Sequence, residues 1–344
     1  MASKAGLYFH IPFCKNKCPY CDFYSVIYCE SAARDYCISL CGEMAKYSGE
    51  FDTVYFGGGT PSIIEPELIC TVLDSARRQF DIDENSEITI ECNPREDLKE
   101  SFELYRKSGI NRVSIGMQSA VDKERFALGR AAGRTEVART VTDAKNAGFS
   151  NVSLDLMLGT PHQTLATLDE TFDFIDKMQV QHISAYMLKI EDGTKFAEMR
   201  DTLPLPDEDE VSEMYLKTIR TLGELGFAQY EISNFAKPGC ESRHNCKYWE
   251  LAPYLGIGKS AHSFWNGRRF YYDENMQIVD DGTGGGTDEK IMLGLRLTKG
   301  IDKSIVSKPY SHLVKMGLLR ETENRLALTP EGMLVSNVVI NELI

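Results

Sequence analysis

Short apolar runs alternate with longer amphipathic segments along the first half of the chain. Within residues 33–47, for example, Cys37, Leu40, Cys41 and Met44 recur at the spacing of a core-facing helix. The apolar runs are nearly continuous, as in parallel strands that are buried on both faces. We expect strands at residues 6–10, 53–56, 87–91, 112–117, 151–157 and 182–187. The pattern predicts an α/β fold in which six strands form a partial TIM-like (β/α)6 barrel.

The second half of the chain predicts a long helix and a small terminal domain. A Pro- and acid-rich break leads into a helical pattern at 207–225, and a Gly-rich stretch at 280–287 is expected to be a flexible hinge. Beyond it we expect helices at 289–297 and 303–316, a hairpin at 318–328, and a last helix with Thr329 as N-cap and Pro330 at its first position. This order resembles a winged helix. The expected domains are therefore a core at 1–227, an extension at 228–283 and a helical or winged-helix-like domain at 284–344.

Composition and charge narrow the possible partners and the compartment. The 344 residues carry a formal net charge of −13, which opposes nonspecific binding to nucleic acid. His10 and Pro12 interrupt the first apolar run before a signal-peptide core could form, and no run approaches the roughly 18 apolar residues of a membrane span. In the reducing cytoplasm that we therefore expect, the ten cysteines would be metal ligands or buried thiols. Nucleic acid is not an expected partner.

Three cysteines near the start of the chain form a C-x3-C-x2-C motif, Cys14, Cys18 and Cys21. Three thiolates are one fewer than the four that a cubane iron–sulfur cluster usually takes, so one iron would stay open to a small molecule. A zinc site completed by His10 or Asp22 is the alternative. The spacing favours the cluster, because one loop carries all three thiols and the sequence has no second hairpin-borne cysteine pair downstream, as zinc sites usually have.

A glycine-rich loop and several polar residues at strand ends predict a polar ligand. Residues 57–59 are glycines that leave the backbone bare, and no lysine follows them as in a phosphate-binding loop. Glu91, Gln118 and Asp155 end three successive predicted strands, and Arg130 follows nearby. A structural network could explain one of these groups and a solvated arginine is common, but three groups at one barrel mouth favour a bound amino-acid-like ligand.

Taken together, these motifs resemble those of radical S-adenosylmethionine (SAM) proteins. The cysteine loop is accompanied by characteristic segments at 57–62, 91–94, 114–119, 182–188, 230–236 and 244–249. More narrowly they resemble the oxygen-independent coproporphyrinogen III oxidase-like group. The resemblance implies a [4Fe-4S] cluster on the three cysteines, SAM on its open iron, and an electron donor that reduces the cluster. The SAM contacts that it implies are Tyr8, Tyr20, Gly58, Gly59, Thr60, Glu91, Gln118, Arg130 and Asp155.

Two departures from the oxidase pattern favour the heme-chaperone branch of this group. The oxidases resemble C-x3-C-x2-C-x-C, whereas Phe23 stands two positions after Cys21, and Cys14 lies close to the start of the chain without the long leader of the oxidases. The segment 244–249 resembles the H-N-x-x-Y-W signature of the chaperone branch, so His244 is a candidate heme-site residue, although a packed histidine is equally plausible.

The branch implies heme as a cofactor and apo-hemoproteins, including membrane-associated respiratory enzymes, as recipients. Coproporphyrinogen oxidase activity is the alternative function, and a radical SAM enzyme acting on another substrate is the third. The missing fourth cysteine leads us to expect no oxidase activity.

Overall fold

Six parallel strands form the centre of the structure, a computed structural model that describes residues 4–95 and 97–344. Each strand pairs with the next one along the chain. They are β1 (Ala5–Ile11), β4 (Glu50–Gly58), β5 (Asp81–Cys92), β6 (Arg112–Gln118), β7 (Asn151–Leu158) and β8 (His182–Met187). All six predicted strands are therefore confirmed. The prediction about a signal peptide concerns a segment whose first three residues lie outside the described part.

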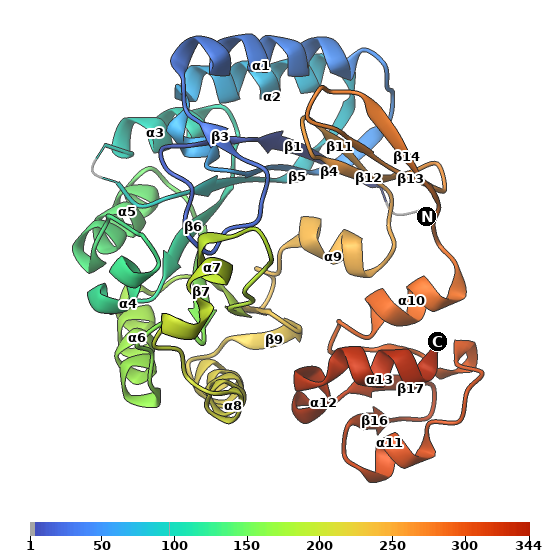
Figure 1. Cartoon of the computed structure of the whole chain (residues 1–344). Helices are drawn as coiled ribbons and strands as arrows, with labels where there is room; N and C mark the ends of the chain where they lie inside the picture. Colours follow the sequence, from blue (N-terminus) through green and yellow to red (C-terminus); the bar gives the residue numbers. More distant parts are fainter. Residues whose placement is uncertain (1–3, 96) are drawn as a thin grey trace.

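Helices between these strands cover the outer face of the curved sheet (Figure 1). They are α1 (Glu30–Met44), α2 (Pro66–Gln79), α3 (Lys99–Lys107), α4 (Asp122–Ala127), α5 (Arg134–Asn146) and α6 (Leu165–Met178), and α8 (Glu208–Glu224), which follows β8, joins this layer. The short helix α7 (Lys195–Glu198) also follows β8 but lies at the end of the barrel, where the Phe196 amide donates to the Pro19 carbonyl at 2.9 Å. The sheet ends at β14 on one side and at β9 on the other, so it is an open barrel. The predicted α/β class and partial (β/α)6 architecture are confirmed. No helix among the described residues is both long and apolar enough to cross a bilayer.

Six further strands, which the sequence pattern did not predict, extend this sheet at both edges. They are β9 (Ala228–Glu231) and β10 (Asn234–Ala236) beside β8, and β11 (Tyr254–Ile257), β12 (His262–Trp265), β13 (Arg268–Tyr272) and β14 (Ile278–Thr283) beside β1. These strands are short, with three to six residues each, so they lack a long apolar run. The predicted hinge at 280–287 is wrong in its first part, because β14 pairs with β13 there.

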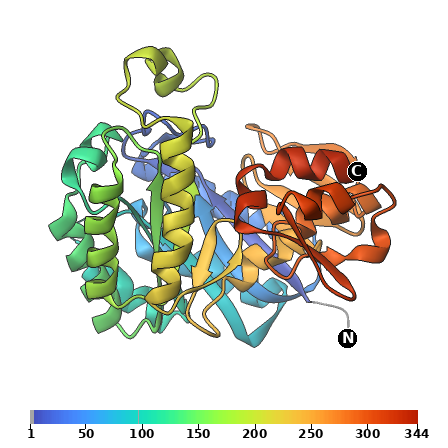
Figure 2. The same ribbon diagram turned by 90° about the horizontal axis from the view of Figure 1, so that it is seen from below.

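The end of the chain folds into a small helical unit with its own sheet, seen at the right of Figure 2. Its elements are α10 (Thr287–Gly294), β15 (Ile301–Asp302), α11 (Ser311–Lys315), β16 (Leu319–Glu321), β17 (Arg325–Leu328), α12 (Pro330–Leu334) and α13 (Ser336–Leu343). The hairpin of β16 and β17 is confirmed, and Thr329 caps α12 by accepting from the Gly332 amide at 3.0 Å. The long helix predicted at 303–316 is wrong, since Pro309 disfavours a helical residue before it and α11 starts beyond it.

The two faces of the central strands differ in polarity. On β1, Leu7, Phe9 and Ile11 are fully buried against the helix layer, and the Phe9 and Phe56 rings stack at 5.1 Å. Tyr8 and His10 alternate with them and so point to the barrel interior. The interior of a TIM barrel is usually filled by branched apolar side chains. Polar side chains at the interior positions of this barrel leave room for a cavity instead.

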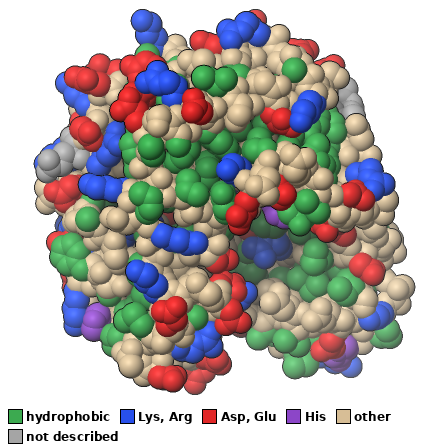
Figure 3. Space-filling model, turned by 45° about the horizontal axis from the view of Figure 1, so that its top comes forward, with side chains coloured by type: hydrophobic (Ala, Val, Ile, Leu, Met, Phe, Trp, Pro, Cys, Tyr) green, Lys and Arg blue, Asp and Glu red, His purple; other side chains and the backbone are tan. Residues whose placement is uncertain are grey.

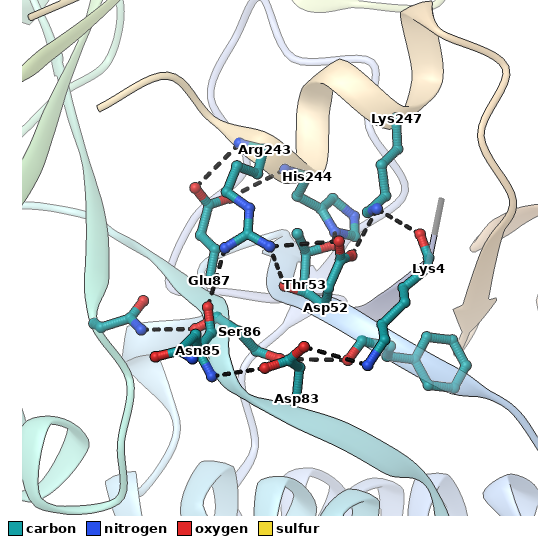
Figure 4. A network of polar contacts seen from close by, with 12 residues as sticks. Lys4, Asp52, Thr53, Asp83, Asn85, Ser86, Glu87, Arg243, His244 and Lys247 are labelled. Atoms are coloured by element: carbon teal, nitrogen blue, oxygen red, sulfur yellow. Dashed lines mark hydrogen bonds and ion pairs between the residues drawn. The ribbon is translucent and has the colours of Figure 1, made fainter. Parts of the chain in front are cut away.

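A short helix, α9 (Arg243–Trp249), lies inside the curve of the barrel and is fixed to the amino ends of the strands (Figure 4). The Glu87 carboxylate on β5 accepts hydrogen bonds from the backbone amides of Arg243 and His244, at 3.1 and 3.0 Å. Lys247 forms an ion pair with Asp52 at 2.6 Å and is almost completely buried. The helix therefore closes the floor of the barrel through buried polar contacts.

His244 is fully buried within this floor and uses both ring nitrogens. Its Nδ1 lies 2.8 Å from Thr53 Oγ1, and its Nε2 lies 2.9 Å from the Tyr248 hydroxyl. Burial lowers the pKa of His244 to about 3, so the ring is neutral. Heme ligation by His244 stays a prediction, and it requires one of these hydrogen bonds to break and the helix to move.

We expect His244→Ala to lower the free energy of unfolding by about 3 kcal/mol, because it leaves a buried cavity and two unpaired hydroxyls. Urea unfolding measures this change. His312→Ala is the control, since His312 is exposed and pairs only with Glu342, and it should cost about 0.5 kcal/mol or less. Equal stability of the two variants would contradict a structural role for His244.

Candidate functional site

A cavity of about 880 Å³ lies within the barrel and opens at the carboxyl ends of the strands. The space-filling view shows a hollow with basic side chains at its floor, beside a face where hydrophobic side chains gather (Figure 3). Cys14, Cys18 and Cys21 line the cavity. So do eight of the predicted SAM contacts, which are Tyr20, Gly58, Gly59, Thr60, Glu91, Gln118, Arg130 and Asp155. The structure therefore brings these residues together around one space.

The cysteine loop is tied at both ends and crosses the cavity mouth. Strand β2 (Phe13–Cys14) pairs with β3 (Val26–Ile27), which closes the loop at its base. The Cys21 amide donates to the Cys18 carbonyl at 3.1 Å, and Cys14 Sγ lies 3.6 Å from Thr60 Oγ1. All three thiols are free and partly exposed. Three free thiols on one anchored loop beside a cavity fit the ligand set of an iron–sulfur cluster with an open iron.

The described residues contain no set of three or more His, Cys, Asp or Glu side chains arranged around a single metal ion. His10, the possible zinc ligand, has its Nδ1 3.1 Å from the Tyr8 hydroxyl and its Nε2 3.1 Å from the Tyr24 carbonyl. The thiolates of a cubane each bind a different iron and so do not converge on one point. Both ring nitrogens of His10 are engaged, so neither is free to complete a zinc site.

The pKa of one cysteine in the loop is shifted by its surroundings. Burial raises the pKa of the Cys21 thiol, and the nearby Cys18 and Cys14 raise it further, while the Phe23 backbone opposes the shift. Thiolates are the metal-binding form of cysteine, and bound metal ions favour them. A metal cation bound at Cys21 would counter this shift and favour the thiolate.

The glycine loop packs directly against the cysteine loop. Gly58 has φ of +111°, and a Cβ there would lie 2.6 Å from His10 Cε1. A Cβ on Gly59 would lie 2.8 Å from the Phe13 carbonyl oxygen. Side chains at these positions would therefore separate the two loops. The glycines keep bare backbone at the cavity wall, next to the cysteines.

A chain of hydrogen bonds links the glycine loop to the opposite wall. Asn93 donates from Nδ2 to Thr60 Oγ1 at 2.9 Å and accepts at Oδ1 from Arg130 Nη1 at 2.6 Å. The other terminal nitrogen of Arg130 donates to the Tyr20 hydroxyl at 2.7 Å. The chain fixes the Arg130 guanidinium at the cavity wall, where it can bind a ligand carboxylate.

Two buried carboxylates supply the negative side of the cavity. Glu91 accepts from the Tyr55 hydroxyl at 2.8 Å and from the Gly58 amide at 3.2 Å, and burial raises its pKa to about 7. Asp155 accepts from the Ser114 hydroxyl at 3.0 Å, and burial raises its pKa to about 6. A cationic ligand would favour the ionised forms of both groups. The cavity thus holds two carboxylates and one guanidinium, which complement the two charged groups of an amino acid.

Arg125 positions this site, although no motif distinguishes it from its neighbours in the short helix α4. Its fully buried guanidinium donates from Nε to the Ala132 carbonyl at 2.8 Å and from Nη1 to the carbonyls of Ser119, at 3.2 Å, and Met117. These bonds connect the end of β6 with the loop that carries Arg130. At that strand end Gln118 has φ of +68°, an uncommon conformation for a residue other than glycine. Arg125 therefore helps to hold Gln118 and Arg130 in place.

Two predicted site residues lie away from the cavity wall. Tyr8 contacts His10 through its hydroxyl and lies 6.1 Å from the Tyr55 ring, behind the glycine loop. It is not among the residues that line the cavity. His244 lies below it in the floor of the barrel. Contact of either residue with a cofactor stays a prediction.

Comparison with known proteins agrees with this geometry. Residues 8–175 match the model of the radical SAM superfamily. The chain is 31% identical to the heme chaperone HemW of Bacillus subtilis, over 96% of this chain and 97% of that one. It is 38% identical to HemW of Haemophilus influenzae, over 75% and 69% of the two chains. The solved coproporphyrinogen III oxidase HemN of Escherichia coli, a radical SAM enzyme, superposes with a TM-score of 0.82 at 20% identity and covers 99% of this chain and 90% of its own.

The similarity to HemN shows a shared fold, while the similarity to the HemW proteins extends over the sequence of most of this chain. The chain belongs to the radical SAM superfamily and, within it, to the family of the heme chaperone HemW.

Proposed function

We propose that the protein is a heme chaperone that carries a [4Fe-4S] cluster, binds SAM, and passes heme to apo-hemoproteins. The observation that carries this proposal is the convergence of three free thiols, eight SAM-type residues and a cavity of about 880 Å³ at one barrel mouth. A cavity of this size is at the upper end of the range for small-molecule sites. It supports binding of a second ligand in addition to SAM.

Different residues of the chain would hold the cluster and SAM. Cys14, Cys18 and Cys21 would bind three irons, and the glycine loop would present its backbone to the ligand on the fourth. Glu91 would attract a cationic group, and Arg130 would bind a carboxylate. A reduced cluster supplies an electron to a ligand on its open iron.

Exposed apolar side chains at the mouth of the cavity favour a chaperone function over an oxidase function. Phe23 stands where the oxidase pattern has a fourth cysteine, and it lines the cavity and is 64% exposed. Ile27 on β3, at the base of the same loop, is exposed to the same extent. Exposed apolar side chains beside a cavity suit a flat apolar ligand or a partner protein. Coproporphyrinogen III oxidase activity is the second candidate, because the fold is shared with HemN.

The proposal extends to the partners and the compartment. Heme is the cargo, apo-hemoproteins such as membrane-associated respiratory enzymes are the recipients, and an electron donor reduces the cluster. The site of action is the cytoplasm. The net charge of −13 argues against nucleic acid as a partner.

A heme titration beside a turnover assay tests this function. The anaerobically reconstituted protein should bind heme, as followed by its Soret absorbance, and should transfer it to an apo-hemoprotein. With coproporphyrinogen III, SAM and a reductant, it should form no product at a catalytic rate. Catalytic product formation would replace the chaperone proposal with the oxidase, and absence of heme binding would remove the proposal altogether.

We expect SAM affinity to fall roughly tenfold between pH 8 and pH 6. Glu91, with a pKa of about 7, becomes protonated in this range and loses its attraction for a cation. Equilibrium dialysis of SAM at several pH values measures this dependence. Glu91→Gln should bind SAM weakly at every pH, with most of the dependence gone.

Glu84→Gln, at an exposed position of β5, is the control and should behave like the unchanged protein. A pH dependence that persists in Glu91→Gln would assign the titration to another group.

A further inference from the structure

Arg112 is a buried cation at the deep end of the cavity. It begins β6, at the amino end of the strand, and only 2% of its surface is exposed. It nevertheless lines the cavity. Its guanidinium has no hydrogen bond or ion pair with any residue that the structure describes, and its Nε is buried without a partner. Of the predicted SAM contacts, Gln118 lies at the other end of the same strand.

The carboxylates nearest to Arg112 are engaged elsewhere. Asp155 accepts from Ser114, and Glu91 accepts from Tyr55 and Gly58. Arg112 lowers the pKa of both groups through space but forms no ion pair with either. A buried charge without a partner is costly and is retained where a ligand completes the site.

The cavity that Arg112 lines holds further polar side chains besides the predicted SAM contacts. Ser184, Ser233, Asn234 and Asn245 line the same cavity, and Asn234 Oδ1 is also buried without a hydrogen-bond partner. Arg112 and Gln118 are six positions apart on β6, so their Cα atoms lie roughly 20 Å apart. A ligand that reaches Arg112 must therefore extend well past the mouth where the cysteines lie.

We propose that Arg112 binds a carboxylate of a ligand that lies deeper in the cavity than SAM. Resting on the proposed function, this carboxylate is a propionate of heme, and Arg112 anchors the heme inside the barrel. A guanidinium suits this role because it presents paired donors that match a carboxylate. The amino-acid end of SAM is the other source of such a carboxylate.

Heme and heme dimethyl ester, whose propionates are uncharged, distinguish these sources. Both are titrated into the anaerobically reconstituted protein and into Arg112→Gln, Arg112→Lys and Arg268→Gln. Arg268 is an exposed arginine paired with Asp280 on the β13–β14 hairpin, so the last variant makes the same chemical change away from the cavity. SAM affinity is measured on each variant.

We expect Arg112→Gln to bind heme about ten- to hundredfold more weakly, since a charged hydrogen bond is lost. Heme dimethyl ester should bind the unchanged protein and Arg112→Gln equally, as in a double-mutant cycle. Arg112→Lys should recover part of the affinity for heme, and Arg268→Gln should retain all of it. SAM affinity should change less than twofold.

Thermal unfolding of the ligand-free variants separates binding from structure. Because Arg112 has no partner, Arg112→Gln should unfold at the same temperature as the unchanged protein or at a higher one. A lower unfolding temperature with equal losses for heme and its ester would mean that Arg112 is structural, which overturns the inference.

Three other results would each decide a different part of the two proposals. Equal heme affinity in Arg112→Gln and the unchanged protein overturns the role of Arg112 and leaves the chaperone proposal intact. A loss of SAM affinity with no difference between heme and its ester assigns the carboxylate to SAM and overturns the propionate. No heme binding by the unchanged protein overturns both proposals.

Discussion

The structure depends on placing polar and charged groups inside a barrel that would ordinarily be filled with apolar side chains. Each buried group costs free energy unless a partner replaces its lost water. Glu87 is satisfied by the amides of α9, and Arg130 by Asn93 and Tyr20. The outer face of the same strands carries the apolar core, for which Phe9 and Phe56 are representative. Stability therefore comes mainly from the helix layer, and the interior is left free for binding.

This division explains why the cavity has two distinct regions. At the mouth the cysteine and glycine loops touch, and the strand-end groups are fixed by a continuous chain of hydrogen bonds. In the floor α9 closes the barrel, and Arg112 has no partner among the residues that the structure describes. Burial raises the pKa values of Glu91 and Asp155, and a bound cation would stabilise the ionised form of both carboxylates. Ligands at the mouth and near the floor would therefore occupy one continuous cavity.

Much of the fold and of the mouth could be predicted from the sequence, because the relevant signals are local. Buried parallel strands produce continuous apolar runs, and the cysteine spacing lies within one loop. The strands β9–β14 are short and carry no such run, so they were missed. Arg125 and Arg112 gave no local signal either, since their roles depend on carbonyls or on a cavity that tertiary folding creates. His244 shows the converse: a motif singled it out, and the structure places both ring nitrogens in hydrogen bonds.

The central claim is that Cys14, Cys18 and Cys21 hold a cluster with one iron open toward the cavity. Electron paramagnetic resonance of the reduced, anaerobically reconstituted protein, recorded with and without SAM, tests it most directly. We expect one [4Fe-4S] cluster per chain and a spectrum that changes when SAM is added, and Cys18→Ala should lose both the cluster spectrum and its response to SAM. A spectrum unaffected by SAM, or a protein that contains stoichiometric zinc and no inorganic sulfide, would contradict it.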